Sequence, residues 1–189
     1  MKTILRIRPY YSAKTLVDQY ETHVWGIMET HNGAIFHAST SALAKIDRLQ
    51  KHFLDELQLT EEEAFLQFNF APPILRRNIG ILGLLHKRVL GKAHPIFESL
   101  LPFHFDVFGN FRPGEHRKQL YNHICDMYFQ PELFKRSIFN MVYSYNRLPN
   151  DAIECMSVKL FQSCLTKMAR DQCEHENPRW KFMFDRRLH

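Results

Sequence analysis

The fold follows most directly from residues 39–57, which read STSALAKIDRLQKHFLDEL. Apolar residues in this stretch recur at steps of three or four, and most positions between them are charged or polar. The apolar positions are Leu43, Ile46, Leu49, Phe53 and Leu57. Because an α-helix repeats every 3.6 residues, these side chains share one face. The stretch is therefore predicted to be an amphipathic helix that begins after Ser39 and Thr40.

Further helices are predicted on either side of this stretch. Upstream, Ser12 is a suitable N-cap for a long helix, and Asn32-Gly33 is the point at which that helix breaks. Downstream, Thr60 and Glu63 have the spacing of a capping box, which opens a short helix over residues 64–69. The buried stripe of the upstream helix is formed by Leu16, Tyr20, Val24 and either Ile27 or Met28.

The next helix begins after Pro72-Pro73, since proline is favoured in the first turn, and Gly91 is its C-terminal cap. Apolar residues almost surround this helix, so it is predicted to be the central one. Gly80 and Gly83 give it a flat face against which a neighbouring helix can pack closely. Its apolar stripe consists of Leu75, Ile79, Leu82, Leu85 and Val89.

Four phenylalanines follow between Pro102 and Gly114. Alternation of Phe with polar residues is compatible with a short strand. The Gly, Asn and Pro residues among them instead favour an irregular loop whose phenylalanine rings pack into the core. Helical spacing resumes at Leu120 and continues to a last helix capped by Ser157. No structure is predicted for the tail that starts at Cys173.

The predicted fold class is mainly α: an irregular multi-helix bundle with a Phe-rich loop. A chain of 189 residues suits a single domain. The predicted organisation is an N-terminal extension (1–11), an N-terminal helical part (12–101), the Phe-rich loop (102–114), a C-terminal helical part (115–170) and a polar tail (171–189).

Composition and charge restrict the functional classes. The net charge of +5 favours an acidic partner, of which nucleic acid is the most frequent. No apolar run has the length of a membrane span, and residues 1–9 lack the apolar centre of a signal peptide. The four cysteines are widely spread, which favours unpaired thiols over a disulfide framework or a zinc site at Cys164, Cys173 and His175. A soluble, intracellular protein is expected, with nucleus and cytoplasm both left open.

Chemical signatures of catalysis are missing from the sequence. There is no Gly-rich phosphate loop, no nucleophile elbow and no helical pair of histidines flanking a glutamate. The aspartates are scattered, whereas two-metal chemistry needs clustered carboxylates. Glu61 to Glu63 form the one acidic cluster, and helix capping explains it. We therefore expect no catalytic residues, no metal site and no cofactor.

Basic residues at both ends of the predicted central helix form the candidate binding site. Phosphate contacts need cations on one face, and such residues can form a basic edge that binds nucleic acid without sequence specificity. A solvated helix face without a ligand explains the same residues equally well. The candidate nucleic-acid-binding residues are Arg76, Arg77, Lys87, Arg88 and Lys92.

A turn and the helix after it carry a more specific pattern. The residues concerned are Tyr145-Asn146-Arg147-Leu148-Pro149, Ile153, Ser157-Val158, Phe161-Gln162 and Leu165. The pattern resembles the region near the C-terminal end of reverse transcriptase open reading frames of non-LTR (LINE-type) retrotransposons, where an aromatic-Asn-x-Leu-Pro turn leads into a Ser-Val/Leu-x-x-Phe-Lys/Gln helix. Upstream segments look like the helices that follow the palm in the same polyproteins. These segments are residues 23–25, 29–34, 42–50, 71–77 and 82–91.

The resemblance covers residues 12–168, whereas the fingers, the palm with its aromatic-x-Asp-Asp hairpin and the endonuclease have no counterpart. It implies a post-palm, thumb-like helical region of a parent that is an RNA-directed DNA polymerase and grips a template–primer duplex. The function expected from it is a non-catalytic module that binds RNA or an RNA–DNA hybrid. Two alternatives stay open: a helical module that binds a protein partner, and a fragment of a decayed element with no present role.

Overall fold

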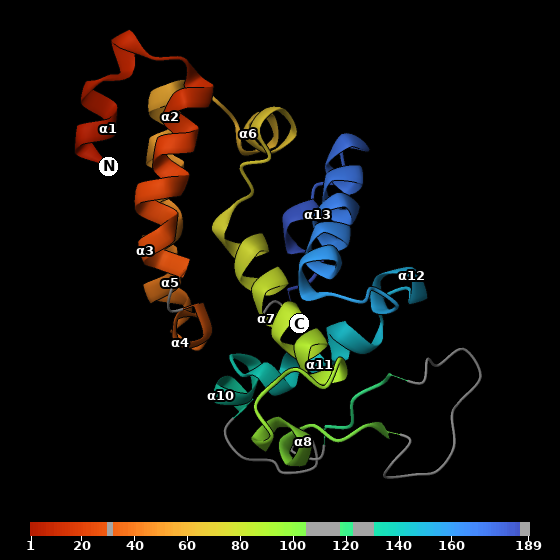
Figure 1. Ribbon diagram of the computed structural model, residues 1–189. Helices are drawn as coiled ribbons and strands as arrows, with labels where there is room; N and C mark the ends of the chain where they lie inside the picture. Colours follow the sequence, from red (N-terminus) through yellow and green to blue (C-terminus); the bar gives the residue numbers. More distant parts are fainter. Residues whose placement is uncertain (30–31, 105–117, 123–130, 186–189) are drawn as a thin grey trace. The chain divides into compact units, whose positions relative to one another are not determined.

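The structure of the chain is a computed structural model, and helices account for most of the residues that it describes (Figure 1). Among those residues no sheet forms, although Phe103 and Leu120 make an isolated antiparallel bridge. The expectation of a mainly α-helical fold is therefore confirmed. Three phenylalanines of the expected Phe-rich loop, at positions 105, 108 and 111, lie outside the described residues. The described residues are 1–29, 32–104, 118–122 and 131–185.

The chain forms two compact units, each of which takes residues from two separate parts of the sequence. The first unit consists of Met1–Arg77 with Ala169–Met183, and the second of Asn78–Met168 with Phe184–His189. The single domain expected from the sequence stays a prediction. The described elements of the first unit are α1 (Lys2–Arg6), the 3-10 turn η1 (Arg8–Tyr10), α2 (Ala13–Tyr20), the π-helical turn η2 (Glu21–Trp25), α3 (Gly26–Glu29), α4 (Asn32–Phe36), α5 (Thr40–Leu57), α6 (Glu61–Phe68) and the 3-10 turn η4 (Trp180–Phe182). Those of the second unit are α8 (Ile96–Leu100), α10 (Pro131–Lys135), α11 (Ile138–Asn146) and α12 (Asn150–Ile153), while α7 (Pro73–Val89) and α13 (Val158–Glu174) contribute residues to both units.

Three helices of the first unit, α2, α5 and α6, start where the sequence predicts. The hydroxyls of Ser12 and Ser39 each accept a hydrogen bond from a backbone N–H three residues on, at 3.3 Å. Thr60 and Glu63 form a complete capping box, with distances of 3.1 and 2.8 Å. These bonds satisfy N–H groups that have no partner within the helix, which explains why the starts are readable from the sequence.

The chain between α2 and α5 differs from the predicted long helix. A π-helical turn, η2, follows α2. Such a turn holds one residue more than an α-helical turn, so the 3.6-residue spacing of apolar residues does not predict it. The sequence predicts a break at Asn32-Gly33, but both residues lie within α4. The burial of Phe36 at the end of α4 outweighs the weak helix propensity of asparagine and glycine.

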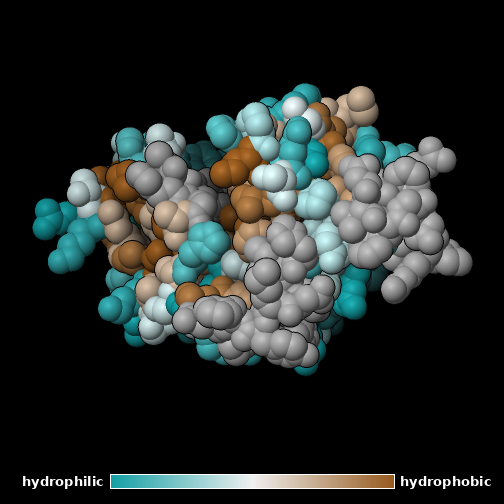
Figure 2. Space-filling model, turned by 90° about the horizontal axis from the view of Figure 1, so that it is seen from below, coloured by the Kyte–Doolittle hydropathy of each residue, from teal (hydrophilic) through white to brown (hydrophobic). Residues whose placement is uncertain are grey.

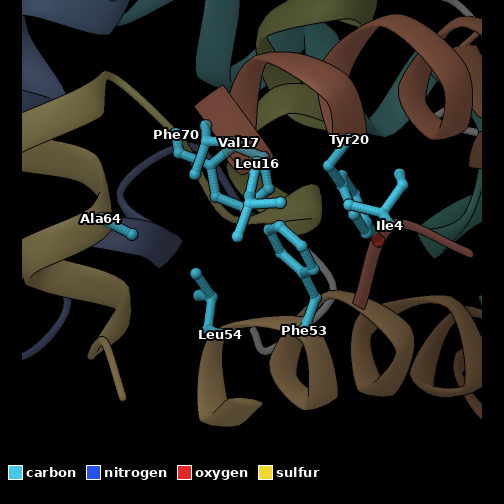
Figure 3. Close-up of a cluster of buried hydrophobic side chains, with 8 residues drawn as sticks. All are labelled: Ile4, Leu16, Val17, Tyr20, Phe53, Leu54, Ala64 and Phe70. Atoms are coloured by element: carbon cyan, nitrogen blue, oxygen red, sulfur yellow. The ribbon is translucent and has the colours of Figure 1, made fainter. Parts of the chain in front are cut away.

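The core of the first unit joins α1, α2, α5 and α6 (Figure 3). The ring of Tyr20 lies 4.4 Å from that of Phe53, at a tilt of 31°, and meets Phe70 edge-on at 5.5 Å. Ile4 of α1 packs into the same cluster, so the segment expected as an extension supplies part of the core. The cluster consists of Ile4, Leu16, Val17, Tyr20, Phe53, Leu54, Ala64 and Phe70.

The buried face of α5 is rotated from the predicted one. Leu49 is 43% exposed, whereas Gln50 is 2% exposed. Burial of this amide is possible because Gln50 accepts a hydrogen bond from the Trp25 indole at 3.2 Å and donates one to the Ala71 carbonyl at 3.0 Å. A pattern that only distinguishes apolar from polar residues does not predict the burial of a polar amide whose hydrogen bonds are all made.

The C-terminal segment from Ala169 to Met183 packs against α6. Trp180 stacks on Phe65 at 5.0 Å with nearly parallel rings, and its indole N–H donates to Glu62 at 3.3 Å. Lys181 pairs with Glu61 at 2.5 Å. The acidic first turn of α6 therefore anchors this segment as well as capping its own helix.

Within the second unit, α7 and α13 meet closely at Gly83, as the sequence predicts for the small-residue face of α7. A Cβ atom at Gly83 would lie 2.5 Å from Nε2 of Gln162 and 3.0 Å from its Cδ. The predicted end of α7 is also confirmed, since Gly91 has a φ of +67°. The N–H groups of Gly91 and Lys92 donate to the carbonyls of Arg88 and Lys87 in the pattern of a Schellman cap. None of the helices in the described ranges combines the length and apolar composition that crossing a membrane requires.

The contact at Gly83 gives a test by double-mutant cycle. Alanine favours a helix over glycine by about 1 kcal/mol, but in the wild type it must displace Gln162. Gly83→Ala is therefore expected to be at least about 1 kcal/mol more favourable in a Gln162→Ala background than in the wild type. Urea unfolding of the four proteins measures this difference, and equal effects in both backgrounds would show that the close contact does not exist.

Candidate functional site

The five predicted nucleic-acid-binding residues are divided between the two units. Arg76 and Arg77 belong to the first, and Lys87, Arg88 and Lys92 to the second. Their surroundings differ enough that each has to be considered separately. That they bind nucleic acid stays a prediction.

Arg77 is engaged within the first unit. Its side chain is 9% exposed, and its two terminal nitrogens donate to the two carboxylate oxygens of Asp47 at 2.8 and 3.2 Å. This bidentate geometry suits a guanidinium and leaves neither oxygen of Asp47 without a cation beside it. A phosphate would have to compete with that carboxylate.

Arg88 is engaged within the second unit. Its Nε donates to the carbonyls of Phe97 and Leu101, both at 3.2 Å, and its guanidinium lies 4.7 Å from the centre of the Phe103 ring. The residue is 7% exposed. Arg88 therefore closes the turn after α8 instead of presenting its charge to a ligand.

Lys87 and Lys92 are the exposed members of the predicted set. Among the described residues, neither ammonium group has a hydrogen bond or an ion pair. Both lie at the C-terminal end of α7, where the helix dipole also favours positive charge. They remain available for an anion.

The solvent face of α5 is a basic surface that the sequence analysis did not single out. We call it the α5 basic face; it consists of Lys45, Arg48, Lys51 and His52, all exposed. No hydrogen bond or ion pair to these side chains is found in the described ranges. Asp55 is the exposed acidic residue on the same face.

Ion pairs from other elements explain why this face stays basic. Asp47 and Glu56 have i,i+4 spacing to Lys51 and His52, respectively, and would be suited to pair with them along the helix. Instead, Arg77 binds Asp47, and Arg8 binds Glu56 at 2.7 Å. Two of the three acids of α5 are thus paired from outside the helix, while Asp55 and the bases face water. Sequence spacing alone does not show this, because Arg8 and Arg77 are distant in the chain.

Trp25 and Arg76 form a second feature of the first unit. The indole of Trp25 stacks on Phe70 at 4.7 Å on one face, and the Arg76 guanidinium carbon lies 3.0 Å from the ring centre. With the hydrogen bond to Gln50, the indole is held by contacts on both faces and at its N–H edge. Arg76 is thereby oriented on a rigid support.

A small pocket opens beside this stack. Its volume is about 30 Å³, and apolar side chains supply most of its walls. Apolar residues reach the solvent in several places on the face of the molecule shown in Figure 2. The pocket is lined by Trp25, Met28, Ile35, Ile46, Gln50, Pro73, Arg76 and Arg77, all of the first unit.

The buried histidine of the second unit has a structural role. His86 is stacked on Phe161 at 4.1 Å, and its Nε2–H donates to the Cys155 carbonyl at 2.8 Å. Its Nδ1 therefore accepts from the Tyr145 hydroxyl at 3.0 Å. Burial lowers the pKa of His86, the Cys155 carbonyl opposes this, and the positive charge of Lys118 adds to the lowering. The ring is neutral and fully hydrogen-bonded.

In the described ranges, no three His, Cys, Asp or Glu residues come together in a way that could hold a metal ion. Burial raises the pKa of the Cys164 and Cys173 thiols, which keeps both protonated at neutral pH. The absence of metal and cofactor that the sequence predicts stays a prediction.

Comparison with known proteins gave no match to a protein-family model, to a curated protein or to a solved structure. The resemblance to the post-palm region of retrotransposon reverse transcriptases therefore stays a hypothesis, carried by the residues quoted above.

Two buried tyrosines provide a matched pair of substitutions. Tyr145→Phe removes the donor to His86 and is expected to lower the free energy of unfolding by about 1–2 kcal/mol. The Tyr20 hydroxyl has no hydrogen-bond partner among the described residues, and burial raises its pKa to about 12. Tyr20→Phe is therefore expected to leave the free energy of unfolding unchanged or to raise it by up to about 1 kcal/mol. Urea unfolding decides, and equal losses in both variants would contradict these assignments.

His86 also predicts a pH dependence. As the pH falls through the ordinary histidine pKa of 6.5, the unfolded chain takes up a proton at this residue, whereas the folded state takes it up only at a lower pH. The contribution of His86 to the free energy of unfolding is thus fully present above pH 6.5 and is lost as the pH falls towards the lowered folded-state pKa. In NMR spectra of the folded protein, the protonation midpoint of the His86 ring is expected to lie below the ordinary pKa of 6.5. A midpoint at or above 6.5 would contradict the neutral, buried ring.

Proposed function

We propose that the chain is a non-catalytic, intracellular helical module that binds the sugar-phosphate backbone of RNA or of an RNA–DNA hybrid. The observation that carries the proposal is the α5 basic face, whose cations have no carboxylate partners in the described part of the chain while Asp47 and Glu56 are paired elsewhere. Unpaired cations on one helix face are what phosphate binding requires.

The dimensions of α5 suit a strand of nucleic acid. Lys45, Arg48 and Lys51 follow one another at steps of three residues, so they cover roughly 9 Å along the helix axis. Phosphates of one strand are about 3.4 Å apart along a duplex axis, and three cations on this length meet several of them. Such contacts give affinity without reading sequence.

The resemblance to a thumb-like region supports the same function. In the second unit, Tyr145 and Asn146 of the resembling turn have structural roles. Asn146 donates to the carbonyl of Leu120 and accepts from its N–H, at 2.9 and 3.0 Å. A turn that fixes the packing of helices is consistent with a module that positions a duplex and carries out no chemistry on it.

Salt-dependent binding tests the proposal. The wild type is expected to bind a labelled 20-base-pair RNA–DNA hybrid at about 50 mM salt, with affinity falling steeply as salt rises. Replacing Lys45, Arg48 and Lys51 together by Gln is expected to reduce the slope of log K against log salt by about 2.7 units, since each phosphate contact contributes about 0.9. The slope is measured by fluorescence anisotropy at four salt concentrations.

A second triple variant serves as the matched control. Lys14, Lys159 and Lys167 are exposed and scattered over the chain, and their replacement by Gln removes the same charge. This control is expected to retain most of the wild-type slope. The proposal fails if the wild type shows no binding at about 50 mM salt, or if both triple variants change the slope equally.

A further inference from the structure

We propose that two tyrosines at η1, Tyr10 and Tyr11, stack on unpaired nucleotides of a single-stranded extension of the bound nucleic acid. The inference rests on the proposed function, in which the α5 basic face holds the duplex. It adds a second binding element within the same unit and specifies the ligand as a hybrid with a single-stranded end.

The two tyrosine side chains are exposed. Tyr10 is 82% exposed and Tyr11 is 53% exposed. In the described part of the chain, neither side chain makes a hydrogen bond or a ring contact. Met1, Leu5 and Ile7 of the same segment pack against the core of the first unit. The core therefore accounts for the apolar residues up to Ile7 and leaves two tyrosine rings available to a ligand.

The turn that carries the tyrosines is held in place. Pro9 lies in the first turn of η1 and fixes a backbone dihedral, and the N–H of Tyr11 donates to the carbonyl of Arg8 at 3.4 Å. Arg8 in turn donates to the backbone carbonyl and to the carboxylate of Glu56, at 2.6 and 2.7 Å. Rings presented by a fixed turn lose less conformational freedom on binding than rings on a mobile segment.

The same ion pair places the turn beside one end of the α5 basic face. Glu56 follows His52 of that face by one helical turn. Tyr10 and Tyr11 are two and three residues beyond Arg8, so their Cα atoms lie within ~11 Å of its Cα. A strand whose phosphates follow the α5 basic face towards its C-terminal end therefore reaches the tyrosines.

The charge of the surrounding segment favours nucleic acid as the occupant. Residues 1–11 contain three basic residues and no acidic one. Lys2 and Arg6 have i,i+4 spacing on the exposed side of α1, opposite Ile4, which packs into the core (Figure 3). Neither cation forms an ion pair within the described ranges. Free cations next to exposed aromatic rings are the combination that binds single-stranded nucleic acid, through its phosphates and its bases.

Stacking requires that the nucleotides be unpaired. Within a duplex, neighbouring base pairs cover each face of a base, so an aromatic side chain reaches a base face only where the strand is single. Every base has such a face, and stacking is therefore tolerant of sequence, as are the phosphate contacts of the α5 basic face. The two elements together bind a junction between a duplex and a single strand.

Two ligands that differ only in the bases of the extension test the inference on the full chain. Both contain the 20-base-pair RNA–DNA hybrid with a six-nucleotide extension of the RNA strand. One extension is oligouridine and the other is abasic, so that the phosphates are the same. Each pair is made with the extension at the 3′ end and at the 5′ end. In at least one polarity, the uridine ligand is expected to bind about tenfold more tightly than the abasic one, as measured by fluorescence anisotropy.

Three double variants locate the effect. Tyr10→Leu with Tyr11→Leu keeps apolar side chains without a ring and is expected to remove most of the tenfold difference, whereas Tyr10→Phe with Tyr11→Phe keeps both rings and is expected to retain it. Lys2→Gln with Arg6→Gln is expected to weaken both extended ligands equally, since it removes charge alone. Lys159→Gln with Lys167→Gln is the control of equal charge and is expected to bind as the wild type does. Circular dichroism verifies that each variant is folded.

Three results would overturn the inference: equal affinities for the uridine and abasic ligands in both polarities, a difference that survives the leucine variant, or a phenylalanine variant that loses as much as the leucine variant. The proposed function is read separately, from binding of the blunt hybrid. For a protein that binds no hybrid, an oligouridine decamer and an abasic decamer give the same comparison without a duplex. Equal or absent binding of those two decamers would overturn the inference as well.

Discussion

The bidentate ion pair between Arg77 and Asp47 is the contact on which the candidate binding surface of the first unit depends. It holds the first turn of α7 against α5 and thereby builds one wall of the pocket. It also engages one of the two α5 carboxylates that have i,i+4 spacing to Lys51, Asp47, while the other, Asp55, is exposed. One interaction therefore contributes to two features of the first unit: the α5 basic face and the pocket beside Trp25.

The second unit depends on a different kind of contact, a neutral hydrogen-bonded core. His86 connects three parts of the chain, since it is stacked on Phe161 of α13, bound by Tyr145 of α11 and hydrogen-bonded to the carbonyl of Cys155. A buried polar group is tolerated only when its donors and acceptors are satisfied, and both ring nitrogens are. The turn that resembles a retrotransposon motif thus has a defined physical role as a packing element.

The fold was largely predictable because its helix starts depend on hydrogen bonds between residues close in the sequence. The candidate site was largely unpredictable because it depends on contacts between residues far apart in the sequence. The starts at Ser12, Ser39 and Thr60 depend on bonds that reach three residues, and a sequence displays those directly. The contact of Arg77 with Asp47 spans 30 residues and depends on packing that no spacing rule contains. For the same reason, the sequence does not show that Arg77 and Arg88, both predicted to bind nucleic acid, have partners within the protein. It also does not single out the exposed bases of α5, whose spacing predicts only the polar face of an amphipathic helix.

The most direct test of this account follows the arginine side chains during a titration with nucleic acid. NMR spectra that resolve the Nε–H groups distinguish two arginines. Arg48 reports on the α5 basic face, and Arg77 reports on the ion pair with Asp47. On addition of the RNA–DNA hybrid, the Arg48 signal is expected to shift and broaden in a salt-dependent manner, while the Arg77 signal keeps its position. A shift of Arg77 without a shift of Arg48, or no change in either signal, would contradict the account.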